Sequence, residues 1–237
     1  MIHGIFLDFI VKTFIIFVVL LAIILPKRKF KIYGFLPKNL YFTFKWSIVF
    51  MIIFILPAVI SIIISIILGI AKPAKLSLLT IILNIVFFMI FVGFIEEAYF
   101  RGYVQSRLNE AFDKRHRKLI FKAWRVNYGT GLFLTSVIFA LMHIVNYWNP
   151  IMSKWEPTWW MPIHILGCFV FGCIVGALRE ASDIYVSSSL HGSIMIAYTF
   201  LSIYANEWIL NISLFISWFI FFNTLTFFFH QSKKYVF

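Results

Sequence analysis

Two adjacent carboxylates, Glu96 and Glu97, stand at the end of an apolar run from Leu76 to Phe94. That run is long enough to cross a bilayer, and charged side chains at membrane depth mark a functional site because their transfer from water is costly. On a helix, Glu97 and Arg101 are four residues apart with the acid first, which favours an ion pair. Glu96 points about 100° away from Glu97. We therefore expect Glu97 to serve the structure and Glu96 to be available for proton transfer.

Two histidines stand in later apolar runs. His143 ends the segment Phe139-Ala140-Leu141-Met142-His143, and His191 lies within Ser187-Ser188-Ser189-Leu190-His191-Gly192-Ser193. A single intramembrane histidine more often bonds a neighbouring helix than takes part in chemistry, and both acids could instead meet water at a helix end beside Arg101 and Arg107. Two histidines and a carboxylate on three separate spans each need a polar partner, however, and one shared cavity is the cheapest solution. We therefore expect Glu96, His143 and His191 to line a common site.

The composition assigns the chain to the membrane proteins. Of its 237 residues, 62% are apolar and 13% charged, and the mean hydropathy is +0.94. A soluble domain of this balance would expose large apolar patches. The formal net charge is +12, but the basic residues lie between the apolar runs, where they set orientation, so we expect a lipid bilayer as partner and no nucleic acid. Cys168 and Cys173 share one span and are interpreted as small apolar residues.

The apolar runs predict the fold class, an all-α polytopic bundle of about seven transmembrane helices. The first run lacks a basic leading region and a small-residue cleavage site, which indicates a retained helix rather than a signal peptide. Pro57 is expected to kink the second helix. The predicted spans cover residues 5–25, 46–70, 76–111, 129–147, 162–178, 184–204 and 208–229.

The loops between these spans differ in charge. Those at 26–45, 101–125 and 179–183, together with the C-terminus, carry 17 Lys and Arg residues, and the opposite loops carry 3. Lys12, inside the first span, belongs to neither side. Because basic loops remain in the cytoplasm, we expect a cell-membrane protein with its N-terminus outside and its C-terminus cytoplasmic. Several Trp residues between 148 and 160 then fall at the outer interface.

The polar residues of the spans form an ordered pattern: Glu96-Glu97-x-x-x-Arg101, then Phe139-x-x-x-His143, then His191 in a later span. This pattern resembles the CPBP family of CAAX prenyl protease and bacteriocin-processing membrane proteins, also called the Abi family. Phe171-Gly172-x-x-x-Gly176, ahead of the last histidine, is similar to the family as well. The resemblance covers most of the chain. It divides the chain into N-terminal spans (1–75), a protease-like core (76–205) and a C-terminal span with a basic tail (206–237).

The resemblance implies an intramembrane endopeptidase. Glu96 would activate the attacking water, and His143 and His191 would assist it and stabilise the intermediate. Glu97 and Arg101 would hold the helix geometry. The implied substrates are prenylated CAAX-type peptides, leader peptides or other membrane-associated peptides, and the sequence does not select among them.

One position departs from the family pattern. The family often carries Asn four residues after the last histidine, where this chain has Met195. The oxyanion-stabilising role usually given to that Asn is unfilled, and Asn146 or Ser193 are candidates to supply it. The alternative is a catalytically impaired scaffold or peptide-immunity factor with the same fold. A proton-relaying transporter is a third reading, but the chain shows no repeated halves.

A cofactor is not predicted. The alternative is a divalent metal such as zinc, held by Glu96, His143 and His191 with an open position for water. The depth of these residues poses a difficulty, because Glu96 stands 23 residues after Pro73 whereas His143 is four residues before Tyr147. A shared site requires a third span that starts well outside, or a fourth that ends deep with residues 146–161 dipping in as a lid.

Overall fold

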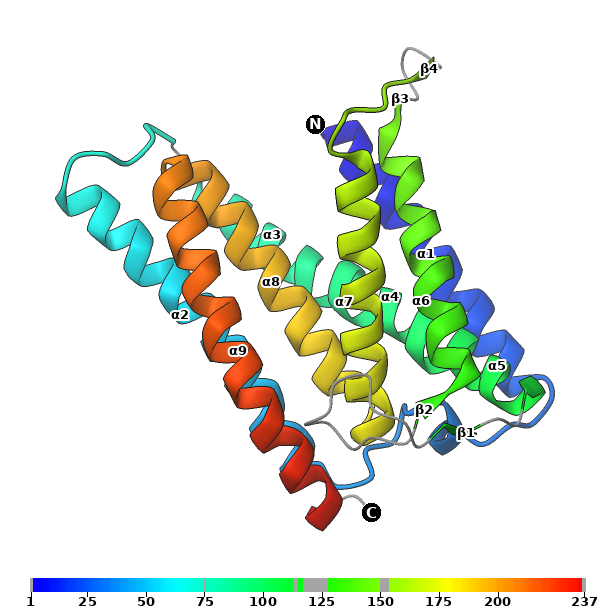
Figure 1. The fold of residues 1–237 in the computed structure, drawn as a ribbon. Helices are drawn as coiled ribbons and strands as arrows, with labels where there is room; N and C mark the ends of the chain where they lie inside the picture. Colours follow the sequence, from blue (N-terminus) through cyan, green and yellow to red (C-terminus); the bar gives the residue numbers. More distant parts are fainter. Residues whose placement is uncertain (1, 75, 113–114, 117–127, 150–153, 236–237) are drawn as a thin grey trace.

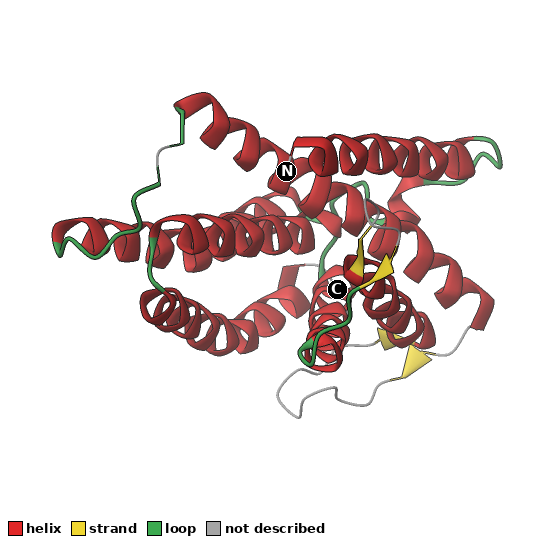
Figure 2. Cartoon of the chain, turned by 90° about the horizontal axis from the view of Figure 1, so that it is seen from above, coloured by secondary structure: helices red, strands yellow, loops and turns green. Residues whose placement is uncertain are grey.

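The computed structural model describes residues 2–74, 76–112, 115–116, 128–149 and 154–235. Nearly all of the described chain is helical (Figures 1 and 2). The first helix, α1 (Ile2–Ile24), contains a shorter apolar stretch, Phe9–Ile24. Six further helices are long and apolar enough to cross a membrane, which confirms the predicted all-α bundle of about seven spans. They are Leu40–Ile67 (α2), Leu78–Phe112, Thr130–Tyr147, Met161–Ala181 (α7), Ile184–Tyr204 (α8) and Glu207–Tyr235 (α9).

Side-chain caps fix where several helices begin. Asn39 accepts a hydrogen bond from the Phe42 amide at the start of α2. Asp183 accepts from the amides of Tyr185 and Val186 at the start of α8. Such caps satisfy amides that have no partner within the helix. They also explain why α2 starts six residues before the predicted position 46, because hydropathy detects only the apolar part of a helix.

The helix that carries the two acids changes its winding along its length. It consists of α3 (Leu78–Val86), η2 (Phe87–Phe94), α4 (Ile95–Glu97), η3 (Ala98–Val104) and α5 (Gln105–Phe112). Both η2 and η3 are π-helical, so the two acids lie on a single α-turn between two wider segments. π-helical turns are rare and are frequently found at functional sites. The sequence predicted the extent of this helix well but not its π-helical segments.

The length of the same helix removes the depth difficulty. Its 35 residues span about 50 Å, well beyond the hydrocarbon thickness of about 30 Å. The helix runs obliquely across the bundle in Figure 1, so each residue advances less in depth than in an upright helix. The described residues do not show the alternative, a fourth span that ends deep beneath a dipping lid. There, β3 (Trp148–Asn149) and β4 (Lys154–Trp155) project beyond the helix ends, and residues 150–153 lie outside the described chain.

The main apolar core lies between α2, α7, α8 and α9, together with α6 (Thr130–Met142). Aromatic rings dominate the α2–α9 contact, where the ring centroids of Trp46 and Phe228 are 5.1 Å apart. The N-terminal helix belongs to a second, smaller cluster. Val19 and Ile23 of α1 pack there with Tyr33 of η1 (Phe30–Tyr33). Consequently α1 is anchored through its C-terminal half.

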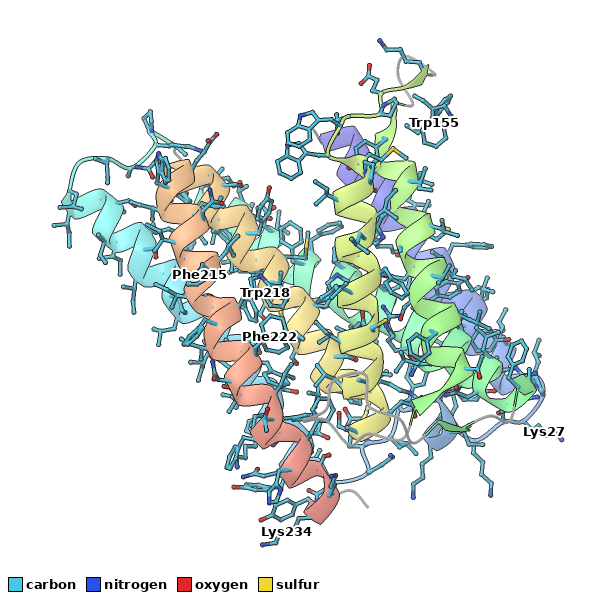
Figure 3. The ribbon with its side chains drawn as sticks, viewed as in Figure 1. Lys27, Trp155, Phe215, Trp218, Phe222 and Lys234 are labelled. Atoms are coloured by element: carbon cyan, nitrogen blue, oxygen red, sulfur yellow. The ribbon has the colours of Figure 1, made fainter. Side chains whose placement is uncertain are left out.

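The two ends of the bundle differ in chemistry. The first and last described residues lie at opposite ends in Figure 1, as an odd number of spans requires. Lys27 and Lys234 lie at one end and Trp155 at the other, while Phe215 and Phe222 project outward from α9 (Figure 3). The remaining short ladder pairs β1 (Arg115–His116) with β2 (Tyr128–Gly129). Residues 113–114 and 117–127, which include the second half of the predicted basic loop 101–125 apart from Arg115 and His116, lie outside the described residues.

Candidate active site

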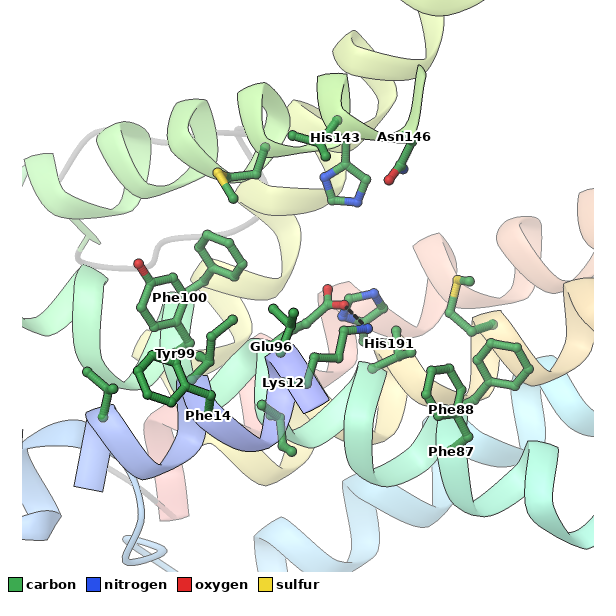
Figure 4. A pocket seen from close by; sticks show the side chains of 18 residues that line it. Lys12, Phe14, Phe87, Phe88, Glu96, Tyr99, Phe100, His143, Asn146 and His191 are labelled. Carbon is green, nitrogen blue, oxygen red and sulfur yellow. Dashed lines mark ion pairs between the residues drawn. The ribbon is translucent and has the colours of Figure 1, made fainter. Parts of the chain in front are cut away.

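A cavity of about 700 Å³ lies between α1, the helix of the two acids, η4 (His143–Tyr147) and α8. Besides the Tyr99 hydroxyl, its polar and charged lining groups are Lys12, Glu96, His143, Asn146 and His191. In Figure 4, His143 and Asn146 form one wall, and the other three face them from the opposite side. The rest of the lining combines aliphatic side chains and Met195 with aromatic rings, which come from Phe14, Phe87, Phe88, Tyr99 and Phe100. The structure thus brings the three residues expected to form a common site to one cavity.

Glu97 is the more deeply buried acid of the pair. Its Oε2 lies 3.3 Å from Arg101 Nε, and both side chains are fully buried. Its Oε1 lies 3.0 Å from His191 Nδ1. Since an ionised carboxylate only accepts hydrogen bonds, His191 donates from Nδ1 and keeps Nε2 for a second hydrogen bond. The predicted Glu97–Arg101 ion pair is confirmed, and the same carboxylate also orients His191.

Glu96 has a different partner, which the sequence analysis missed. Lys12 Nζ of α1 lies 2.8 Å from Glu96 Oε1, and the two side chains are 12% and 19% exposed. The same ammonium lies 5.5 Å from the centroid of the Phe87 ring. A lysine inside an apolar span is as unusual as a glutamate there. That rule, applied to Lys12, would have marked it as a member of the site.

His143 is the first residue after the α-helical part of the fourth span. Its Nδ1 lies 2.8 Å from the Phe139 carbonyl oxygen. A carbonyl only accepts, so Nδ1 carries the proton and Nε2 is the accepting nitrogen. The ring of His164 lies 5.8 Å from that of His143, and its Nδ1 is 3.0 Å from the Tyr147 hydroxyl. His164 is not among the residues that line the cavity.

Phe139 sets the spacing between the two histidines. Its ring centroid is 4.5 Å from that of His143 and 6.1 Å from that of His191. The Arg101 guanidinium lies 4.7 Å from the same ring, within the range of a cation–π contact. Phe139 is 1% exposed. The Phe-x-x-x-His spacing therefore places an apolar spacer beneath the site and a histidine at its wall.

Glycines allow α8 to approach the helix of the two acids closely. A Cβ atom at Gly93 would lie 2.7 Å from the Ser188 carbonyl oxygen, and one at Gly192 would lie 3.0 Å from the Phe88 carbonyl oxygen. Neither position has room for a side chain. This contact brings His191, next to Gly192, within reach of Glu97.

The two candidates for the missing amide role are placed differently. Asn146 lines the cavity. Ser193 is fully buried, donates its hydroxyl to the Leu190 carbonyl and is not among the lining residues. Met195, where the family often carries Asn, does face the cavity. Of the two candidates, the structure therefore brings only Asn146 to the site.

The donor set does not fit a metal ion as the side chains stand. Among the described residues, no group of three His, Cys, Asp or Glu side chains is placed to hold one. Glu96, which would be one ligand, faces the Lys12 ammonium instead. The zinc alternative stays a prediction.

Comparison with known proteins identifies the family. The family model described as type II CAAX prenyl endopeptidase Rce1-like matches residues 77–197, which include Glu96, His143 and His191. No curated protein and no solved structure matches the chain. The match agrees with the resemblance to the CPBP proteins and implies a CAAX-type protease of the membrane. Since it covers just over half of the 237 residues, the chain belongs to the Rce1-like family of type II CAAX prenyl endopeptidases.

Proposed function

We propose that this protein is a glutamate-dependent intramembrane endopeptidase with Glu96 as its general base. One observation supports this assignment above the others. Of the two adjacent acids, Glu97 is fully buried, paired in charge with Arg101 and hydrogen-bonded to His191, whereas Glu96 opens onto the cavity. A base must reach the water that it deprotonates, and Glu96 has that access.

The proposed reaction is amide hydrolysis without a covalent enzyme intermediate. Glu96 takes a proton from water as the water oxygen attacks the scissile carbonyl carbon, whose π electrons move to oxygen. The tetrahedral oxyanion then collapses, the C–N bond breaks, and the proton held by Glu96 passes to the leaving amine. His143 and His191 each present Nε2 as a hydrogen-bonding group on opposite walls of the cavity, and there they orient the water and the peptide.

The lining of the cavity supports an apolar or lipidated peptide as substrate. A volume of about 700 Å³ falls within the range of small-molecule pockets, roughly 300–1,000 Å³. Aromatic rings from α1 and the helix of the two acids cover much of its wall, among them Phe14, Phe87, Phe88 and Phe100. Prenylated CAAX-type peptides fit this surface, and hydrophobic leader peptides are the second substrate class.

The orientation in the cell membrane is part of the proposal. We infer an outer N-terminus and a cytoplasmic C-terminus, because Lys27 and Lys234 gather at one end of the bundle and Trp155 lies at the other. A CAAX-type substrate would then approach from the basic, cytoplasmic end. Accessibility labelling of single cysteines placed at each end tests this orientation.

The decisive experiment compares wild type with Glu96→Gln in detergent. Both are incubated with internally quenched peptides, prenylated and unprenylated, with and without a chelator. We expect Glu96→Gln to lower kcat by about 10²–10⁴-fold, the usual range for loss of a general base. Glu110→Gln, at an exposed pair on the same helix, is the matched control and should keep full activity. Full activity in Glu96→Gln would contradict the proposal, and loss of wild-type activity with chelator would favour the metal alternative.

The second candidate function is a non-catalytic scaffold or peptide-immunity factor. Met195 favours it, because this residue faces the cavity without an amide donor. The Lys12–Glu96 contact also neutralises the acid in the resting state. A scaffold would retain its phenotype in Glu96→Ala cells with normal expression, whereas an enzyme would lose it.

A further inference from the structure

The cavity contains a cation that the proposed reaction has not used. Of the described residues lining it, Lys12 is the one Lys or Arg. Its ammonium is 2.8 Å from Glu96 Oε1 and lies beside the Phe87 ring. A charge at this depth is costly to maintain unless it serves a purpose. Glu97 is paired with Arg101 of its own helix, so a carboxylate here does not need a cation from another helix. The contact of Glu96 with Lys12 of α1 therefore needs a separate explanation.

We propose that Lys12 is a catalytic residue that stabilises the oxyanion of the tetrahedral intermediate. This inference rests on the proposed function, with Glu96 as the base. A water held by Glu96 attacks a carbonyl about 3 Å away, and the oxyanion then forms within a few ångströms of the Lys12 ammonium. Oxyanion donors act at about 2.7–3.1 Å from the developing charge. The flexible four-carbon stem of lysine allows the small movement from Glu96 to that position.

The balance of charge in the cavity supports this role. Before the reaction, Glu96 is negative and Lys12 positive. When Glu96 accepts the proton from water, its negative charge is transferred to the carbonyl oxygen of the substrate. The ammonium then faces the oxyanion in place of the carboxylate, and the net charge of the apolar cavity is unchanged. Electrostatic stabilisation of this kind is strong where water is excluded.

The other donors around the cavity are largely committed. His191 Nδ1 is bonded to Glu97, and His143 Nδ1 to the Phe139 carbonyl. Ser193 donates to Leu190 and faces away from the cavity. Met195 has no N–H group to offer. Asn146 stays available on the wall opposite Lys12, so it can orient the substrate while Lys12 supplies the charge.

The position of Lys12 on α1 follows from the sequence. Lys12, Val19 and Ile23 are separated by seven and four residues, a spacing that places them on one face of a helix. Val19 and Ile23 are buried against η1 and so fix the rotation of α1. The same rotation directs Lys12 into the cavity. An apolar side chain at position 12 would be equally compatible with an apolar membrane helix. Packing alone therefore does not require a lysine there.

The test uses the full chain in detergent with the best cleaved peptide and its phosphinate analogue. In the analogue, an anionic tetrahedral phosphorus replaces the scissile carbonyl carbon. We expect Lys12→Met to lower kcat by about 10²–10³-fold, as loss of one oxyanion donor does, with KM changed by less than about threefold. Lys12→Arg, which keeps the positive charge, should retain much of the wild-type kcat. Lys45→Met is the matched control, because Lys45 is also an intrahelical lysine 5.5 Å from an aromatic ring, but is bonded to Gln231 on α9.

Lys12 could act on the oxyanion itself or only by positioning Glu96. Phosphinate binding, measured with and without Glu96→Gln, distinguishes these two roles. We expect Lys12→Met to weaken phosphinate binding by at least about tenfold whether or not Glu96 is present, and to leave binding of the parent peptide nearly unchanged. Weakening only when Glu96 is present would overturn the proposal, as would an unchanged kcat in Lys12→Met. Lys12→Gln replaces the Met variant if the latter does not fold. No cleavage by folded wild type would defeat the proposed function itself, whereas wild-type cleavage with an unaffected Lys12→Met defeats this inference alone.

Discussion

Two ion pairs start from neighbouring residues of one helix and differ in almost every physical respect. Glu97 pairs with Arg101 of its own helix, and both side chains are fully buried. Glu96 pairs with Lys12 of another helix, and both side chains keep some exposure to a cavity. The first pair uses a planar guanidinium held beneath the Phe139 ring. The second uses a compact ammonium on a flexible stem.

The difference shows how adjacent like charges come to occupy separate environments. Removing one partner of a buried pair leaves the other charge uncompensated in the core, so the pair that also contacts His191 suits a structural role. A pair at a cavity wall can exchange its partner for water or substrate. The single α-turn between two π-helical segments directs the two carboxylates to these two environments.

Removing each acid in turn tests most directly whether the two acids differ in their contribution to stability. We expect Glu97→Ala to lower the free energy of unfolding by about 3–5 kcal/mol, because it leaves Arg101 buried without a carboxylate. Glu96→Ala should cost about 1 kcal/mol, since Lys12 can still reach water in the cavity. Thermal unfolding in detergent measures both. Equal losses in the two variants would show that the acids are not divided between structure and chemistry.

Features set within one helix could be predicted from the sequence. The Glu97–Arg101 pair follows from a four-residue spacing. The same geometry explains two placements beside His191. Met195, four residues on, shares its face and lines the cavity, whereas Ser193, two residues on, is rotated by about 200° and faces away. Because of this rotation, Ser193 is not placed as a substitute donor in the cavity.

Features that depend on how helices pack could not be predicted in the same way. The contact between Lys12 and Glu96 joins residues 84 positions apart, and no periodicity within either helix indicates it. The π-helical segments likewise carry no apolar spacing that differs from an α-helix. The shared cavity could be predicted only from the free-energy cost of isolated polar groups in lipid. That cost indicates which residues belong to the site but not the distances between them.

A second prediction concerns the shape of the buried cation. Arg101→Lys keeps the charge but loses the planar group beneath Phe139, and the shorter reach weakens the contact with Glu97. We expect a loss of about 2 kcal/mol in the free energy of unfolding. Arg107→Lys is the control, because Arg107 forms an exposed pair with Glu110, and it should change stability by less than about 0.5 kcal/mol. A similar loss in both variants would mean that burial of Arg101 is unimportant.

A third prediction reverses the interhelical pair. Lys12→Glu alone places two carboxylates together and should destabilise the attachment of α1 by about 1 kcal/mol. The double variant Lys12→Glu with Glu96→Lys restores opposite charges and should recover most of that loss. Activity should not return, because the base is then on the wrong helix. Unfolding temperature and peptide cleavage, measured on the same samples, separate the two effects, and recovery of cleavage would refute the assignment of Glu96.

The smallest expected effect concerns Met195, which faces the same cavity as Lys12. If Lys12 supplies the oxyanion charge, an added amide donor is partly redundant, so Met195→Asn should change kcat by less than about threefold. In the Lys12→Met background the same substitution should raise kcat by about fivefold, equivalent to about 1 kcal/mol of transition-state stabilisation. The comparison of the two ratios is a double-mutant cycle. Equal effects of Met195→Asn with and without Lys12 would show that the two positions act independently, and that the lysine does not occupy the role left open by the methionine.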